Sequence, residues 1–452
     1  MKVELFQTVG KKDSCQKTVV KEFQKDSGEE NQVINLYPQV RDQRWEGFGG
    51  AITDAAGSVF SMLNEGQKNE LLSFYFAPDQ MNYQNVRIPL DSCDFSTQIY
   101  EAVPKKDETL SSFSFEGTMQ YILPLLEEAQ KRAKGKLKLM LSPWSPPAWM
   151  KTNGSRLKGG SLKPEYYGLW AKYLCRYIRE FTERGFQVER LSIQNEPKAV
   201  QTWDSCIYTA EEEKIFLRDY LYPQMQKEDF GDVELFIWDH NKERLFDRVS
   251  QVLDDSTEDK VTGAAFHWYS GDHFEALDLV RKCYPDKKLI LSESCLEYNK
   301  FDKGKECENA ARLAHDMIGN LNHGMCAFYD WNLLLNVSGG PNHVQNFCDA
   351  PFLFDPEEKK LIQRRSAQYY WHFAHFIKPG ARRIGHSCYS GRLELTAWQN
   401  EDGEIVFVLL NAGDKDMDCV LRLEGQEVRF VVDGNAIMSG RISKKEVERY
   451  DS

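Results

Sequence analysis

Two glutamates, each at the end of an apolar run, are the residues best suited to do chemistry. Glu196 lies in LSIQNEP at 191–197, and Glu293 lies in LILSESCLEY at 289–298. Two carboxyl groups that face one glycosidic bond can hydrolyse it, because one protonates the leaving oxygen while the other attacks the sugar or activates water. Either glutamate alone could instead cap a helix or lie in solvent, so the prediction depends on the pair.

The neighbours of the two glutamates suggest their roles. Asn195 could bond to a sugar hydroxyl beside Glu196, which we assign as general acid/base, and Glu293 is then the nucleophile. An acid must be protonated near neutral pH, and the charge of Glu293 is expected to raise the pKa of Glu196. Arg87 could keep Glu293 ionised, although a surface salt bridge is its alternative role. Carboxyls about 5 Å apart would make a retaining enzyme, and about 6.5–9.5 Å an inverting one; we expect the former.

The elements that must position these residues alternate along the chain. Eight strand-like runs begin at residues 45, 84, 137, 188, 234, 263, 288 and 325. Helical periodicity fills the intervals, including Ser58–Phe76, and continues after the eighth run over Leu361–Ile377. Strands that alternate with helices in this way form a parallel sheet, and eight such units close into a (β/α)8 TIM barrel, the α/β fold class that we predict.

Polar and aromatic residues gather towards the C-terminal ends of these runs. Barrel enzymes place their chemistry on that face. From the second run to the eighth, the residues are Arg87, Trp144, Asn195, Glu196, His267, Tyr269, Glu293 and Trp331.

The two flanks of the barrel have a different pattern. Residues 379–452 contain short apolar runs separated by Gly, Asn and Asp, which is typical of β-hairpins. We therefore predict a barrel over residues 45–378 and an attached small all-β sandwich from residues 379–452. Residues 1–44 are expected to add a strand or two to that sandwich.

Composition excludes several classes of partner. The net charge of −12 argues against nucleic acid and against docking to anionic membranes, and no apolar run is long enough to insert into a membrane. The eleven cysteines form no CxxC pair, and the N-terminal residues lack the apolar stretch of a signal peptide. We expect a cytoplasmic protein with free thiols. The sequence does not indicate an oligomeric state.

The motifs together resemble glycoside hydrolase family 30. The resemblance runs from Trp45 to Asp355 through WEGFGGAITDAA, VRIPLDSCDFS, LSPWSPPAWMKTNG, LSIQNEP, HWYSG, LSESC and DWNLLLNVSGGPNHVQNFCDAPFLFD. It implies retaining chemistry on a barrel with a β-sandwich, without a metal or an organic cofactor. It also implies that Glu196 is the acid/base, that Glu293 is the nucleophile and that His267 is a hydrogen-bonding partner behind them. The implied substrate-binding residues are Asp94, Trp144, Asn195, Tyr269, Trp331 and Asn346, with Asp94 on the distal hydroxyls.

The resemblance predicts a carbohydrate or glycoconjugate substrate, most simply a β-glucoside as in a glucosylceramidase. The loop KAVQTWDSCIYTAEEE after Glu196 differs from the one associated with glucosylceramidases, so ceramide as the aglycone is left open. A β-1,6-glucanase, β-xylosidase or β-fucosidase on the same fold is the alternative. A non-catalytic binding protein would need neither glutamate. A metal-dependent hydrolase would be expected to contain HxH or HExxH, and neither motif occurs.

Overall fold

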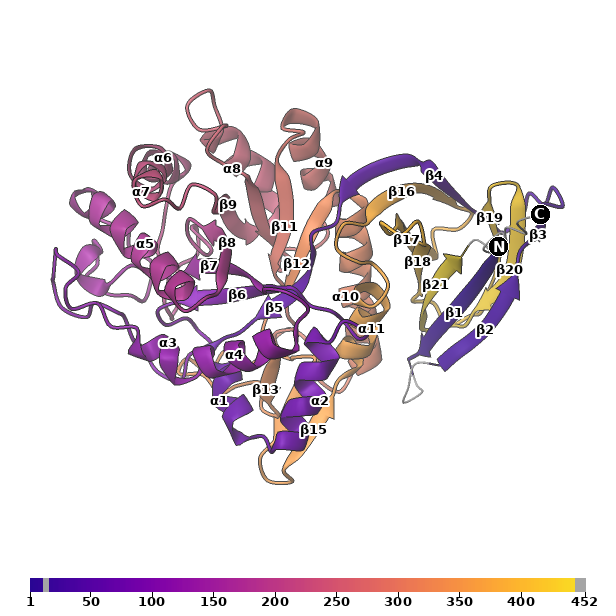
Figure 1. The fold of residues 1–452 in the computed structure, drawn as a ribbon, viewed down its shortest axis with the longest axis horizontal. Helices are drawn as coiled ribbons and strands as arrows, with labels where there is room; N and C mark the ends of the chain where they lie inside the picture. Colours follow the sequence, from indigo (N-terminus) through magenta and orange to yellow (C-terminus); the bar gives the residue numbers. More distant parts are fainter. Residues whose placement is uncertain (11–15, 444–452) are drawn as a thin grey trace, which may run out of the picture. The chain divides into compact units, whose positions relative to one another are not determined.

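A computed structural model describes residues 1–10 and 16–443 (Figure 1). The chain divides into two compact units, each made of segments that are distant in sequence. One unit comprises residues 48–302 and 327–362, and the other comprises residues 1–47, 303–326 and 363–452.

The first unit is organised around a closed barrel of eight parallel strands in chain order, as the sequence predicted. The strands are almost wholly buried, because helices cover their outer face and side chains fill the interior. The strands are β5 (Gly47–Ala51), β6 (Asn85–Leu90), β7 (Lys138–Pro143), β8 (Gln187–Ser192), β9 (Glu234–Asn241), β10 (Gly263–His267), β11 (Lys288–Glu293) and β12 (Met325–Asp330).

Helices follow the strands along the chain (Figure 1). They are α1 (Asp54–Met62), α2 (Glu65–Phe76), α3 (Glu116–Gln120), α4 (Ile122–Arg132), η1 (Ala148–Met150), η2 (Pro164–Tyr166), α5 (Tyr167–Glu183), α6 (Ala210–Ile215), the π-helical η3 (Phe216–Leu221), α7 (Tyr222–Lys227), η4 (Lys242–Arg244), α8 (Leu245–Val252) and α9 (Phe274–Cys283). Two more, α10 (Glu306–Asn322) and α11 (Arg365–Ala374), belong to the second unit.

Two predicted helices differ from the structure. The run Ser58–Phe76 is not one helix, because α1 ends at Met62 and Asn64 begins α2 by accepting a bond from the backbone of Gln67 in a capping box. The run Leu361–Ile377 is helical only over Arg365–Ala374. Its first residues form β15 (Lys360–Gln363), which completes an unpredicted small sheet with β13 (Leu334–Asn336) and β14 (Phe352–Asp355).

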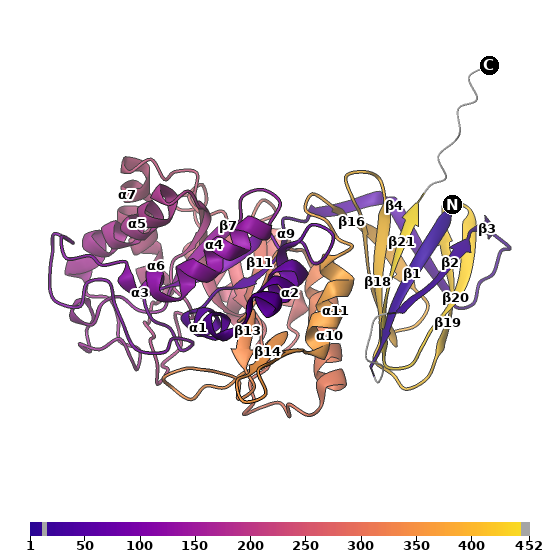
Figure 2. The same ribbon diagram turned by 60° about the horizontal axis from the view of Figure 1, so that its bottom comes forward.

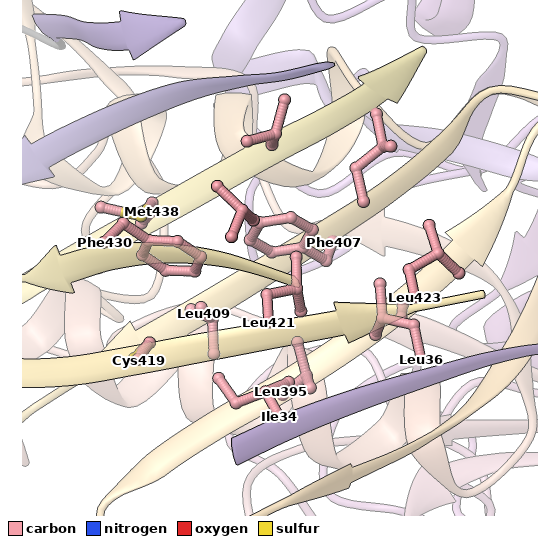
Figure 3. Packing of buried hydrophobic residues seen from close by; sticks show 14 of the residues in the cluster. Ile34, Leu36, Leu395, Phe407, Leu409, Cys419, Leu421, Leu423, Phe430 and Met438 are labelled. Atoms are coloured by element: carbon pink, nitrogen blue, oxygen red, sulfur yellow. The ribbon is translucent and has the colours of Figure 1, made fainter. Parts of the chain in front are cut away.

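The second unit contains a ten-stranded sheet in the order β2-β1-β21-β18-β17-β16-β4-β19-β20-β3 (Figure 2). Its strands are β1 (Lys2–Val9), β2 (Gln16–Glu22), β3 (Gln24–Lys25), β4 (Val33–Arg44), β16 (Arg382–Cys388), β17 (Leu393–Gln399), β18 (Ile405–Asn411), β19 (Met417–Leu423), β20 (Gln426–Val432) and β21 (Ala436–Ser443). Their inward faces form one apolar core in which the rings of Phe407 and Phe430 stack 6.1 Å apart (Figure 3).

The first 44 residues supply four of these strands, where the sequence predicted one or two. Strand β1 pairs with β21 from Lys2↔Ser443 to Val9↔Ala436, and β4 pairs with both β16 and β19. Their partners lie more than 300 residues away, so the local pattern alone did not indicate how many of these runs would pair. Within the described residues, no helix is long and apolar enough to cross a membrane.

Candidate active site

A cavity of about 350 Å³ opens at the C-terminal ends of the barrel strands. Both predicted catalytic glutamates and all the predicted substrate-binding residues line it. From the predicted set these are Asp94, Trp144, Asn195, Glu196, Tyr269, Glu293, Trp331 and Asn346.

One imidazole nitrogen lies between the two glutamates. Nδ1 of His267 is 3.2 Å from Oε1 of Glu196 and 4.0 Å from Oε1 of Glu293. These two carboxyl oxygens can therefore be no further apart than the sum of the two distances. That limit lies below most of the range typical of inverting glycosidases, about 6.5–9.5 Å.

Arg87 is buried at the centre of the site and bonds to its main anions. The side chain is 0% exposed, which excludes the alternative of a surface salt bridge. Its guanidinium donates to Oε2 of Glu293 at 2.5 Å, to Asn195 at 2.9 Å and to Asp239 at 2.9 Å. Burial lowers the pKa of Arg87, but the charges of Asp239 and Glu293 outweigh burial and raise it, so the group is always cationic.

Asp239, at the end of β9, is a site residue that the sequence analysis missed. Its Oδ2 accepts from Ser192 at 2.6 Å and from Arg87, while its Oδ1 accepts from Ser292 at 2.5 Å and lies 3.1 Å from Nε2 of His267. Burial raises the pKa of Asp239, but Arg87 and His267 outweigh burial and hold it well below its ordinary value. The run ELFIWDH ends in polar residues just as the run before Glu196 does, and this signal could have identified Asp239.

The backbone is strained where it positions these groups. Glu196 has a φ of +47°, and Trp238 and Asp239 have φ values of +74° and +49°. The pairing of β9 with β10 shifts register at the same place, so one extra residue is accommodated there. The amide of Glu196 donates to the carbonyl of Asp239 at 2.9 Å and fixes one turn against the other. Non-glycine residues keep such conformations only where their surroundings enforce them.

The protonation of the two glutamates differs from the sequence prediction. Burial raises the pKa of Glu196, but the hydrogen bond from His267 and the charge of the neighbouring histidines outweigh burial and lower it to about 2. Burial raises the pKa of Glu293. The prediction of a raised pKa for Glu196 is therefore wrong for the free enzyme, because it counted only the opposing carboxylate and neither histidine.

The protonation of each of the two carboxyls nevertheless depends on the other. Arg87 donates to Glu293 at 2.5 Å and the Tyr269 hydroxyl donates to it at 2.9 Å, whereas the contacts of Glu196 are longer. These donors would lose most of their stabilising effect if they faced a neutral acid. They therefore stabilise Glu293 in its ionised form, so a proton that enters the pair binds to Glu196.

The inner end of the cavity is lined by stacked indoles and a polar pair. Trp144 and Trp331 stack with their ring centres 5.2 Å apart, and the guanidinium of Arg87 lies 4.9 Å from the ring of Trp144. Nδ2 of Asn346 donates to Asp94 at 3.0 Å. Burial, with the charge of Glu293, raises the pKa of Asp94 well above its ordinary value and so favours the protonated form, which can donate as well as accept a hydrogen bond.

The outer end of the cavity is lined by residues that the sequence analysis did not single out. Gln201 and Trp203 come from the loop after β8, and Nε2 of Gln201 is 3.5 Å from Oε2 of Glu196. Glu297 and Lys300 come from the loop after β11 and form an ion pair of 2.5 Å. Gln201 therefore brings this end of the cavity next to Glu196. No short motif marks these loop residues.

Two family models match the chain. One, described as the glycosyl hydrolase family 30 TIM-barrel domain, matches residues 45–378, and the other, the family's beta sandwich domain, matches residues 380–439. The chain belongs to glycosyl hydrolase family 30. It is therefore a glycoside hydrolase, and its substrate is a carbohydrate.

The relatives of this family 30 chain differ in their named substrates. Mouse lysosomal acid glucosylceramidase is 30% identical over 403 residues, which cover 85% of this chain and 78% of the mouse protein. An endo-1,6-beta-D-glucanase of Neurospora crassa is 28% identical over 416 residues, which cover 88% of this chain and 84% of the fungal protein. The crystal structure of SrfJ from Salmonella typhimurium is similar with a TM-score of 0.94 and 36% identity, and the match covers 98% of this chain and all of SrfJ.

One group of side chains in this hydrolase has the spacing of metal ligands. Among the described residues, Glu196, His240 and His267 offer ligand atoms within 4.8 Å of one another. No sequence motif marks this group, because its members lie in or after three different strands. A histidine ligand must be neutral. Burial lowers the pKa of His267, but Glu293 and the hydrogen bond to Asp239 outweigh burial and raise it to about 9. We therefore assign the group to the handling of protons and charge.

Proposed function

We propose that the protein hydrolyses β-glucosides with retention, by double displacement through a glycosyl ester on Glu293. The main support for the proposal is that one imidazole nitrogen, Nδ1 of His267, lies within 4.0 Å of a carboxyl oxygen of both glutamates. It brings the carboxyls close enough for one to attack the anomeric carbon while the other serves the leaving oxygen.

In the first step, the Glu293 carboxylate attacks the anomeric carbon. A bond forms between that carbon and an oxygen of Glu293, and the bond to the leaving oxygen breaks. Glu196 gives its proton to the leaving oxygen and becomes a carboxylate. Asn195 lies within the same hydrogen-bonded group, because its Oδ1 accepts from Arg87 at 2.9 Å, which leaves its Nδ2 to donate to a sugar hydroxyl.

In the second step, water replaces the leaving group. Glu196, now the base, takes a proton from water while the water oxygen bonds to the anomeric carbon and the ester to Glu293 breaks. The hydrogen bond and positive charge that lower the pKa of Glu196 to about 2 stabilise the carboxylate that the first step leaves behind.

A glucosyl group is the sugar that the inner end of the cavity supports best. Asp94 and Asn346 are hydrogen-bonded to each other at the inner end of the cavity, which we assign to the distal hydroxyls of the sugar including O6. Trp144 and Trp331 supply apolar faces beside them. The named activities of the mouse and Neurospora relatives, on glucosylceramide and on a 1,6-β-glucan, support glucose as the shared sugar.

The residues at the outer end of the cavity bear on the aglycone, the part of the substrate that is attached to the sugar. Gln201, Glu297 and Lys300 are polar or charged and would meet a hydroxylated aglycone better than two alkyl chains. This favours a β-1,6-linked glucan fragment over ceramide. β-Xyloside and β-fucoside activity is the remaining alternative.

A panel of substrates tests the proposal and its alternatives. Release from nitrophenyl β-glucoside, β-xyloside and β-fucoside would be compared with hydrolysis of glucosylceramide and of a β-1,6-glucan. We expect the glucoside to be the best aryl substrate, with the β-anomer of glucose formed first by NMR. An α-anomer as first product would contradict retention, and faster xyloside hydrolysis would contradict the glucosyl assignment.

We also propose that the enzyme works in the cytoplasm. Support comes from the cysteines, since all ten that the structure describes are free thiols. Titration of the denatured, unreduced protein should find all eleven thiols of the sequence. Finding a single thiol would instead indicate an oxidising compartment.

A further inference from the structure

The proposed reaction moves one negative charge between two buried side chains. Before the first step the charge lies on Glu293, and after it the charge lies on Glu196, because Glu293 has become an ester and Glu196 has lost its proton. The second step returns the charge to Glu293. Most of each side chain is enclosed, since 7% of Glu293 and 14% of the Glu196 side chain are exposed. A buried charge needs a partner at every stage of this cycle.

Arg87 can compensate only one end of this movement. Among the interactions described for its guanidinium, the partners are Glu293, Asn195, Asp239 and Ser142, and Glu196 is not one of them. His267 differs, because its Nδ1 lies 3.2 Å from Glu196 and 4.0 Å from Glu293. It is therefore placed between the positions that the charge occupies in turn.

The surroundings of His267 favour the imidazolium form. Nε2 lies 3.1 Å from Asp239, which is ionised and held by Arg87 and two serine hydroxyls, so this nitrogen donates. Nδ1 faces carboxylate oxygens and also donates. The charged or titratable groups that face the ring from the packed elements are Asp239 and His240 of β9, Glu196 after β8, Glu293 of β11, Arg87 of β6 and Tyr269 after β10. The acidic groups among them outnumber the cations.

His240 provides a contrast within the same site. Its Nδ1 lies 3.5 Å from the same oxygen of Glu196, but this nitrogen makes no hydrogen bond to the described residues. Burial lowers the pKa of His240, whereas the pKa of His267 is raised to about 9. The two histidines thus lie at nearly the same distance from Glu196, but their pKa values shift in opposite directions.

We propose that His267 is a positioning residue that remains an imidazolium throughout catalysis and compensates the negative charge as it moves between Glu293 and Glu196. The inference rests on the proposed double displacement. His267 transfers no proton in either step. It acts through the two glutamates by keeping each carboxylate stable when that residue carries the charge.

The first experiment compares His267→Gln with His240→Gln in the full-length enzyme. Glutamine keeps a hydrogen-bonding group but cannot be charged. For His267→Gln we expect kcat/KM on an aryl glucoside to fall by about 10²–10³-fold. Both limbs of its pH profile should move to higher pH by about 1–3 units, because a carboxyl that loses a nearby cation binds its proton more tightly. His240→Gln should leave both limbs in place, whatever its effect on rate.

A purely structural role for His267 would give a different result. The rate would fall while the two limbs stayed at their wild-type pH, and that outcome would overturn the proposal. An equal shift of the limbs in His240→Gln would do the same, because it would show that charge at His267 is not the cause.

The second experiment does not depend on activity or on a variant's folding. In the wild-type enzyme labelled with ¹⁵N-histidine, His267 should show two protonated ring nitrogens at pH 7 and lose a proton near pH 9. His240 should be neutral at pH 7. A neutral His267 at pH 7 would refute the inference even if a glycosyl ester on Glu293 can be trapped, whereas failure to trap any ester would refute the proposed function instead.

Discussion

The two ends of the active-site cavity are built in different ways. Except for Asn346, which lies between β13 and β14, the inner end is made of residues at or near the ends of barrel strands, and Trp144, Trp331 and Asp94 are 2%, 2% and 6% exposed. The outer end is made of loop residues, and the Lys300 side chain there is 53% exposed. The hydrogen bonds between barrel strands hold the side chains at strand ends in place. Loops can vary in length and sequence without disturbing those hydrogen bonds. The difference indicates that the barrel sets the sugar and the reaction, while the loops set what is attached to the sugar.

The largest expected effect comes from removing the nucleophile at the inner end. Glu293→Gln keeps the size of the side chain but cannot form the glycosyl ester. Turnover of every substrate should fall by more than about 10⁴-fold, whatever the leaving group. Initial rates on an aryl glucoside and on a disaccharide would test this. A loss confined to one of the two substrates would show that Glu293 serves the leaving group and not the sugar.

Asp94→Ala tests the sugar specificity of the inner end. The change removes one partner of a partly buried hydrogen bond and leaves Asn346 facing the cavity, at a cost of about 1–3 kcal/mol in transition-state binding. We expect kcat/KM to fall for β-glucosides and much less for β-xylosides, which lack the O6 hydroxymethyl group. Equal losses on the two sugars would remove Asp94 from contact with O6.

Much of this inner end could be predicted from the sequence, because strand runs and the residues at their ends are local patterns. Glu196, Glu293 and Trp331 end or follow apolar runs that also form strands in the structure, whereas Asp94 was predicted only from the family resemblance. Asp239 was missed although it ends a similar run. Its positive φ and the register shift beside it depend on contacts between strands, which periodicity does not show.

The other differences between the sequence predictions and the structure also arise from contacts between residues that are distant in sequence. The pKa of Glu196 depends on His267 and His240, which come from strands β10 and β9 and meet it only in the folded barrel. The β1–β21 pairing joins opposite ends of the chain. The outer end of the cavity is made of loops, whose positions follow from what they contact and not from a repeating pattern.

Trp203→Ala tests whether the outer end contacts the aglycone. Loss of the indole should lower kcat/KM on a β-linked glucose disaccharide, because about 1–3 kcal/mol of apolar contact is removed. β-Glucosyl fluoride has almost no aglycone, so its hydrolysis should change little. Trp149→Ala is the matched control, since that indole donates to the carbonyl of Val103 at 2.9 Å and does not line the cavity. A similar loss on the fluoride would place Trp203 at the sugar instead.

The smallest expected effect is at the exposed rim. Lys300 forms its ion pair with Glu297 at the outer end, and such exposed pairs contribute about 0.2–1 kcal/mol. Lys300→Ala should change disaccharide kinetics by a few-fold at most and leave the fluoride unaffected. Lys305→Ala is the control, because that lysine pairs with Glu308 outside the cavity. A large effect on both substrates would mean that the rim takes part in the chemistry itself.

The central claim is that Glu196 and Glu293 divide the two steps of a double displacement between them. Azide rescue of Glu196→Ala tests it most directly, with an activated aryl glucoside as substrate. Such a leaving group needs little protonation, so the ester on Glu293 should form and accumulate because no base activates water. Azide needs no base, and it should restore turnover and give a β-glucosyl azide. An α-glucosyl azide from this variant, or a β-azide only when Glu293 is the residue replaced, would contradict the account.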